Sequence, residues 1–305
     1  MRDANYKFYD SVPVSSELFQ TISTELEIPS IWPFILAKKS AHVGYIKHEN
    51  TAGQSIISTR RHLEQSFSQD LINLLAFMSR TLGHWYASHA ASVSFNTSSG
   101  TISVYLHIPR EGGMSSQFSC MLADEKGLLH HPGLVPLLLA HLEYLETDRV
   151  LLNRRLECAR LEQDLGHSRL FSETKIKTST PTRSDLDRMS RNNNLFASKL
   201  TTHVERVESA LLRSNCICDF TDEVCKEMKL KGCGESEWQE RSLKIKNHLA
   251  FLQNGWKMML VRYKAFQGST QTQLDVVRST STLAQYQPIT GQYSSDIQSY
   301  RPTRQ

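Results

Sequence analysis

The chain has 305 residues, of which 39% are hydrophobic and 22% charged, the composition of an ordinary globular protein. Its 35 basic and 31 acidic residues give a formal net charge of only +4, which argues against a nucleic-acid partner. No stretch approaches the roughly 18 apolar residues of a membrane-spanning helix, and the N-terminus lacks the apolar run of a secretory signal. We therefore expect a cytoplasmic chain without a membrane span.

The mixture of short helical and β-prone segments in residues 1–132 predicts a small α/β domain, the head. Apolar spacing predicts helices over 15–26 and 67–81. Short β-prone runs predict strands over 42–48 and 55–59, and alternation predicts a hairpin of 92–96 and 101–108 joined by a turn over 97–100. Phe118, Cys120 and Leu122 suggest one more short strand.

Residues 133–287 predict long helices, and residues 288–305 a disordered polar tail. Helical spacing predicts helices over 134–165, 195–215 and 237–266, with a flexible link over 166–194 and a helical extension over 268–287. The predicted fold class is α+β: a small head followed by a bundle of long antiparallel helices that forms a stalk.

Two of these helices carry apolar residues at coiled-coil spacing. The first has a leucine seam made of Leu138, Leu142, Leu145, Leu152 and Leu156, interrupted by Arg149. The third has a heptad face made of Ile245, Leu249, Leu252, Trp256, Met259, Tyr263 and Phe266. A 3.5-residue period favours packing against other helices, although an amphipathic helix on a globular core gives a similar pattern. The heptad face is thus a predicted binding surface for a partner helix.

An acidic cluster on the first long helix contains Glu143, Glu146 and Asp148. Because Mg²⁺ keeps much of its water and needs only one or two carboxylates, these residues are predicted magnesium ligands. A solvated helix face gives the same pattern without an ion. No cofactor other than Mg²⁺ is expected.

Cysteines and histidines offer two further metal-binding patterns. Cys216, Cys218, Cys225 and Cys233 form C-x-C-x₆-C-x₇-C, which provides four thiols, but its irregular spacing is untypical of zinc sites, so free thiols are favoured. His130, His131 and His141 could approach a metal, but a loop pair and a partly exposed helix histidine are the favoured interpretation.

No motif indicates an enzyme. Gly112-Gly113 lacks the Lys-Ser/Thr pair of a phosphate loop, and no set of nucleophile, base and orienting residue stands out. We therefore expect a protein without catalytic activity.

The order of several segments resembles the cytosolic part of fungal CorA-like magnesium and zinc transporters. The resemblance rests on residues 19–28 with Trp32, Phe34 and Leu36, on 131–139 (HPGLVPLLL), and on 271–277 followed by 283–285. It implies a funnel-like domain with a helical stalk, which assembles as a pentamer and senses divalent cations.

The chain departs from that family at the pore. The resemblance implies a Gly-Met-Asn motif and two membrane helices, but Gly113-Met114 is followed by Ser115 and both helices are missing. We expect either a soluble relative or a shortened transporter, with no transport by this chain alone. The predicted function is regulation or assembly, and the alternative is a helical interaction scaffold without an ion function.

Overall fold

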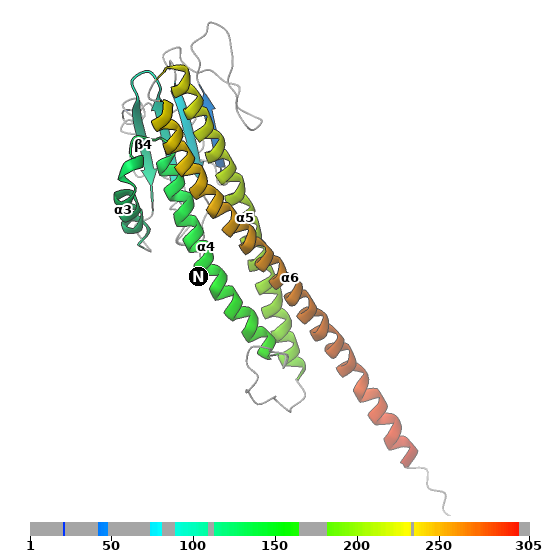
Figure 1. Cartoon of the computed structure of the whole chain (residues 1–305). Coiled ribbons are helices and arrows are strands. Elements are labelled where there is room, and N and C mark those ends of the chain that lie inside the picture. The colour runs from blue at the N-terminus through cyan, green and yellow to red at the C-terminus, as the bar shows by residue number, and fades with distance from the viewer. Residues whose placement is uncertain are drawn as a thin grey trace, which may run out of the picture. The chain divides into compact units, whose positions relative to one another are not determined.

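The computed structural model describes residues 21, 42–47, 74–80, 89–108, 113–164, 182–232 and 235–298. The fold is α+β, with one antiparallel sheet and three long helices (Figure 1). The chain divides into two compact units. Unit 1 is Met1–Thr147 with Ser209–Lys257, and unit 2 is Asp148–Glu208 with Met258–Gln305. Each long helix contributes a segment to both units.

Unit 1 contains a four-stranded sheet in the order β1-β2-β3-β4 with antiparallel neighbours. The strands are β1 (His42–Lys47), β2 (Leu74–Arg80), β3 (Ala90–Asn96) and β4 (Thr101–His107). At the β3–β4 turn, Asn96 Oδ1 accepts hydrogen bonds from the backbone N–H groups of Ser98 and Ser99. Gly100 ends the turn at φ 72°, a conformation that favours glycine. The sequence predictions of β1 and of this hairpin are confirmed.

Strand β2 corrects the prediction of a helix over 67–81. Four consecutive residues, Leu75 to Met78, are buried, so both faces of the strand are covered. A strand covered on both faces has a continuous apolar run, and periodicity cannot distinguish such a run from part of a buried helix. The predicted strand over 55–59 lies outside the described residues. So does the helix over 15–26, except that Thr21 is helical.

Helix α3 (Met114–Asp124) lies where a short strand was predicted around Phe118. That prediction is wrong, because Met114 and Phe118 are one helical turn apart and both are buried on one face of α3. Gly113 is the N-cap residue of this helix and has a φ of 74°. A short 3₁₀ helix, η2 (Lys126–Leu128), follows and leads to His131.

The three long helices are α4 (Leu134–Asp164), α5 (Arg183–Leu230) and α6 (Glu235–Gln298). Helix α4 confirms its prediction. Helix α5 begins well before residue 195, within the range predicted to be a link, and continues through Cys216, Cys218 and Cys225. Thr182 caps it, since Thr182 Oγ1 accepts from the Asp185 N–H while the Thr182 N–H donates to Asp185 Oδ2, both at 3.2 Å.

Helix α6 is longer than predicted. It continues through Gly268 and past Pro288 to Gln298, so the range predicted to be a disordered tail begins inside the helix. A proline removes one backbone hydrogen bond and bends a helix without necessarily ending it.

Within unit 1 the sheet packs on the helices through aromatic side chains. Phe77 of β2 lies against Phe220 of α5, with ring centroids 5.6 Å apart, and Phe95 of β3 lies 5.7 Å from Trp238 of α6. Trp256 of α6 is fully buried and lines the same small cavity as Phe77 of β2. The sheet and the helices therefore share one apolar core.

Unit 2 is built from the second half of α4, the first half of α5 and the second half of α6. Its core includes Phe196, Leu200, Val207 and Tyr263, each 0 or 1% exposed. Glu157 of α4 pairs with Lys199, whereas Arg154 lies beside His203, so α4 and α5 run antiparallel in this unit.

Candidate functional site

The buried charges of unit 1 centre on Glu143 of α4. Glu143 is 2% exposed and Arg213 of α5 is 6% exposed. Arg213 Nε donates to Glu143 Oε2 at 3.2 Å, and Arg213 Nη2 donates to Oε1. The guanidinium thus holds both carboxylate oxygens of a residue that the sequence predicted to bind magnesium.

The other two predicted magnesium ligands do not join Glu143. Glu146 is half-buried and Asp148 is exposed. Residues 143 and 148 point about 140° apart around a helix of 3.6 residues per turn. No group of three or more His, Cys, Asp or Glu side chains in the described ranges is placed to hold a metal ion. The three acids therefore do not form the predicted site.

A cavity of about 10 Å³ adjoins the Glu143–Arg213 pair. Phe77, His89 and Trp256 also line it, and Trp256 Nε1 has no hydrogen-bond partner among the described residues. This volume holds about one water molecule. The cavity is too small to be a substrate pocket.

His131 and Ser242 resemble the histidine–serine pair of a hydrolase, but the hydrogen bond between them runs in the wrong direction for catalysis. The Gly133 N–H donates to His131 Nδ1 at 3.0 Å, which assigns the ring proton to Nε2. Nε2 then donates to Ser242 Oγ, 3.0 Å away, and cannot take the serine proton. Burial, with a smaller effect of Arg241, lowers the pKa of His131 to about 3. This histidine joins the start of α4 to α6.

The other histidines do not converge with His131 on a metal. His130 is exposed. His141 lies against the ring of His248 on α6. His130, His131 and His141 therefore do not meet at one metal site.

The heptad face is directed into the protein. In unit 1, Ile245, Leu249, Leu252 and Trp256 are each 0% exposed. In unit 2, Met259 is 2% and Tyr263 is 0% exposed, and Phe266 is half-buried. A partner helix could reach this face only by displacing the protein's own helices.

The cysteine cluster lies largely within α5, with Cys233 outside the described residues. Two residues of separation turn a helix by about 200°, so Cys216 and Cys218 point away from each other. Burial, with a smaller effect of Asp219, raises the pKa of Cys216 to about 12. The helix therefore does not assemble a thiolate zinc site from these cysteines.

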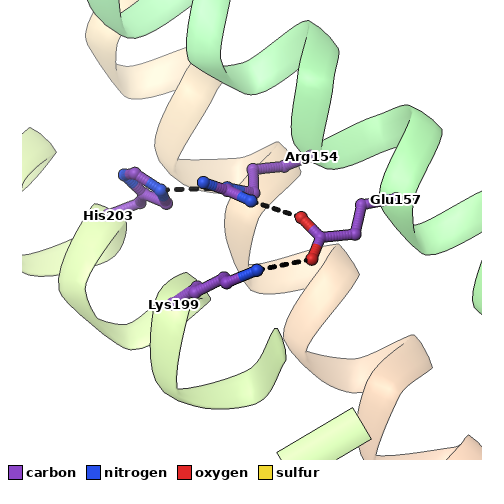
Figure 2. A network of polar contacts seen from close by, with 4 residues as sticks. All are labelled: Arg154, Glu157, Lys199 and His203. Atoms are coloured by element: carbon purple, nitrogen blue, oxygen red, sulfur yellow. Dashed lines mark hydrogen bonds and ion pairs between the residues drawn. The ribbon is translucent and has the colours of Figure 1, made fainter. Parts of the chain in front are cut away.

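Unit 2 contains a polar network that sequence reasoning missed. Figure 2 shows Arg154 between His203 and Glu157, with Lys199 on the other oxygen of that carboxylate. Arg154 Nε donates to His203 Nε2 at 3.1 Å, and Lys199 Nζ donates to Glu157 Oε1 at 2.7 Å. Burial alone would raise the pKa of Glu157, but Lys199 and Arg154 lower it below its usual value. The only sequence signal was the i, i+3 spacing of Arg154 and Glu157.

The network reaches α6 through Tyr263. The Tyr263 and His203 rings stack with centroids 5.4 Å apart and an interplanar angle of 20°. Burial raises the pKa of Tyr263 to about 12. One polar layer thus fixes the three helix segments of unit 2 against one another.

Comparisons with protein-family models, with curated proteins and with solved structures found no match for this chain. No helix in the described ranges is both long and apolar enough to cross a membrane. Fold and site together define an α+β protein in which the most buried charged groups bind one another.

Proposed function

We propose that the protein is a non-catalytic, CorA-like module with a role in assembly or regulation, which associates with further copies of itself through the second half of α4. The order of its parts supports the resemblance, because a sheet-containing region precedes three long helices. The buried polar groups support a role without catalysis, because Glu143 and His131 are engaged in internal contacts. The proposal does not depend on Mg²⁺ at Glu143.

The observation that carries the proposal is the uneven burial of the leucine seam. In unit 1, Leu138 and Leu142 are 1% and 2% exposed, and Leu145, the last seam residue of this unit, is 45% exposed. In unit 2, Leu152 and Leu156 are 57% and 48% exposed. These two leucines are one helical turn apart and share a face of α4. Exposed leucines at such spacing are typical of a helix that packs against another helix.

The charges beside these leucines favour a second copy of the chain as the partner. Asp148 and Arg155 are both exposed, lie seven residues apart and flank Leu152 on the same side of α4. If two copies of this segment pack antiparallel, Asp148 of each copy faces Arg155 of the other. The same surface is therefore complementary to itself in charge and in apolar character.

The mass of the protein in solution tests this proposal. We expect light scattering and sedimentation to give an oligomer for the native chain and a monomer for the Leu152→Asp/Leu156→Asp variant. Leu195→Asp is the matched control, because Leu195 is 59% exposed but belongs to α5. A native chain that stays monomeric up to high concentration would contradict the proposal.

A charge exchange tests the pairing itself. Asp148→Arg should weaken association through like charges, and Asp148→Arg/Arg155→Asp should restore it. Both variants change only exposed side chains, so circular dichroism should show an unchanged fold. If the double exchange fails to restore the mass while the fold is intact, the antiparallel pairing is wrong.

A further inference from the structure

Two imidazole rings from different helices meet in unit 1, apart from the Glu143–Arg213 pair. His141 of α4 and His248 of α6 have ring centroids 4.9 Å apart and an interplanar angle of 72°. Both side chains are half-buried. His141 Nδ1 is shielded from solvent and has no hydrogen-bond partner among the described residues.

We propose that His141 and His248 bind one divalent transition-metal ion, of the class of Zn²⁺ or Ni²⁺, as a two-imidazole clamp between α4 and α6. This inference does not rest on the proposed self-association, which uses other residues.

The spacing of the rings fits a shared metal ion. A Zn–N bond is about 2.0–2.1 Å, so two imidazoles on one tetrahedral zinc have ring centroids about 5 Å apart. The observed separation of the two ring centroids, 4.9 Å, is close to this value. The remaining coordination positions would be taken by water, as in sites that a protein does not fully enclose.

An edge-to-face contact between two rings without a metal has a similar centroid distance, so a second observation must distinguish this contact from a metal site. The unpartnered nitrogen favours the metal. A buried imidazole nitrogen normally has a hydrogen-bond partner, and an unpartnered one carries a cost that a metal bond removes.

The electrostatics of the pair also suit a cation. Burial lowers the pKa of both rings, with His248 adding to the effect on His141, so both are neutral at pH 7 and their lone pairs are available. Glu125, at the end of α3, is close enough to raise the pKa of His248 against the effect of burial. Its carboxylate therefore adds negative charge beside the site.

The donor atoms select the class of metal. Imidazole nitrogen suits Zn²⁺, Ni²⁺ and Cu²⁺, whereas Mg²⁺ prefers oxygen ligands. A metal that binds the folded chain and joins α4 to α6 stabilises it by mass action. Thermal unfolding is thus a direct readout, and Mg²⁺ serves as the control ion.

The experiment uses the full chain without a histidine tag. We expect ZnCl₂ and NiCl₂ to raise the thermal midpoint by several degrees, MgCl₂ to leave it unchanged, and calorimetry to give one Zn²⁺ per chain. His141→Ala and His248→Ala should each abolish both effects. His130→Ala should retain them, because His130 is exposed and outside the pair.

Two results would contradict the proposed metal site. The proposal fails if Zn²⁺ and Ni²⁺ neither bind nor shift the midpoint, or if His141→Ala and His248→Ala bind Zn²⁺ as tightly as the native chain. Where an alanine variant loses its helical circular dichroism, His248→Gln, which retains a polar side chain, replaces it in the same titration.

Discussion

Glu143 and Arg213 are 70 residues apart in the sequence and form a buried, two-pronged ion pair between α4 and α5 in unit 1. Removing one charge from such a pair leaves the other charge buried without compensation. Substitution of one residue of this pair should therefore destabilise unit 1 more than the same change in an exposed ion pair.

We expect Arg213→Met to lower the free energy of unfolding by about 3–5 kcal/mol. The double variant Glu143→Leu/Arg213→Met should recover most of that loss, because an apolar pair leaves no buried charge. Urea unfolding measures both. Arg188→Ala is the control, since the Arg188–Asp185 pair is exposed and should contribute about 0–1 kcal/mol. Equal losses for Arg213→Met and the double variant would contradict the expectation.

Two glycines of α6 should respond in opposite ways to alanine. A Cβ at Gly255 would lie 2.8 Å from both Cζ and Oη of Tyr144, whereas one at Gly268 meets nothing within 4 Å. Gly268→Ala should stabilise the helix by up to about 1 kcal/mol. Gly255→Ala should instead destabilise unit 1 by about 1–3 kcal/mol through overpacking.

A variant of Tyr144 tests whether this side chain causes the effect of Gly255→Ala. In a Tyr144→Leu background the ring is gone, so Gly255→Ala should cost much less than in the native chain. Thermal unfolding of the four proteins in this cycle gives the coupling between the two positions. Additive effects would mean that Tyr144 does not cause the clash.

His131 should make folding sensitive to acid. Its pKa is about 3 in the folded chain and 6.5 as an unperturbed group, so the unfolded chain binds the proton more readily. The contribution of His131 to the free energy of unfolding should be fully present above pH 6.5. It should decrease as the pH falls toward 3, with a slope of up to about 1.4 kcal/mol per pH unit. His141 and His248 act in the same direction, because their pKa values are also lowered.

Urea unfolding between pH 7 and pH 5 measures that slope. His131→Asn should reduce the slope, even if the variant is less stable at pH 7, because one titrating group is gone while His141 and His248 remain. His130→Asn, at an exposed position, should leave the slope as it is. An unchanged slope in His131→Asn would rule out this histidine as its source.

The cysteines should differ in their reactivity toward iodoacetamide. Cys120 is exposed, whereas burial, together with Glu162, raises the pKa of Cys158 to about 11. Cys216, with a pKa of about 12, has a similarly small thiolate fraction at neutral pH. Peptide mass spectrometry should therefore find Cys120 alkylated before Cys158 and Cys216, and in urea the rates of these three should converge. Cys216 reacting as fast as Cys120 in the folded chain would contradict this order.

Periodicity predicted the long helices and the β3–β4 hairpin because both patterns are local. It failed at β2 and α3. The run Leu75–Met78 is apolar on every residue, so only the cover on both faces of the sheet makes it a strand. At α3, the apolar residues at 118, 120 and 122 suggested alternation, but burial of Met114 and Phe118 on one face selects the helix.

The sequence by itself determined that α4 and α6 are helices and which of their residues are apolar, because helical propensity and 3.6-residue spacing are properties of neighbouring residues. Tertiary structure alone decided what those faces contact. It buried the heptad face inside the chain and left Leu152 and Leu156 exposed. It also matched Glu143 with Arg213 and His141 with His248, since contacts between distant residues depend on how the helices pack.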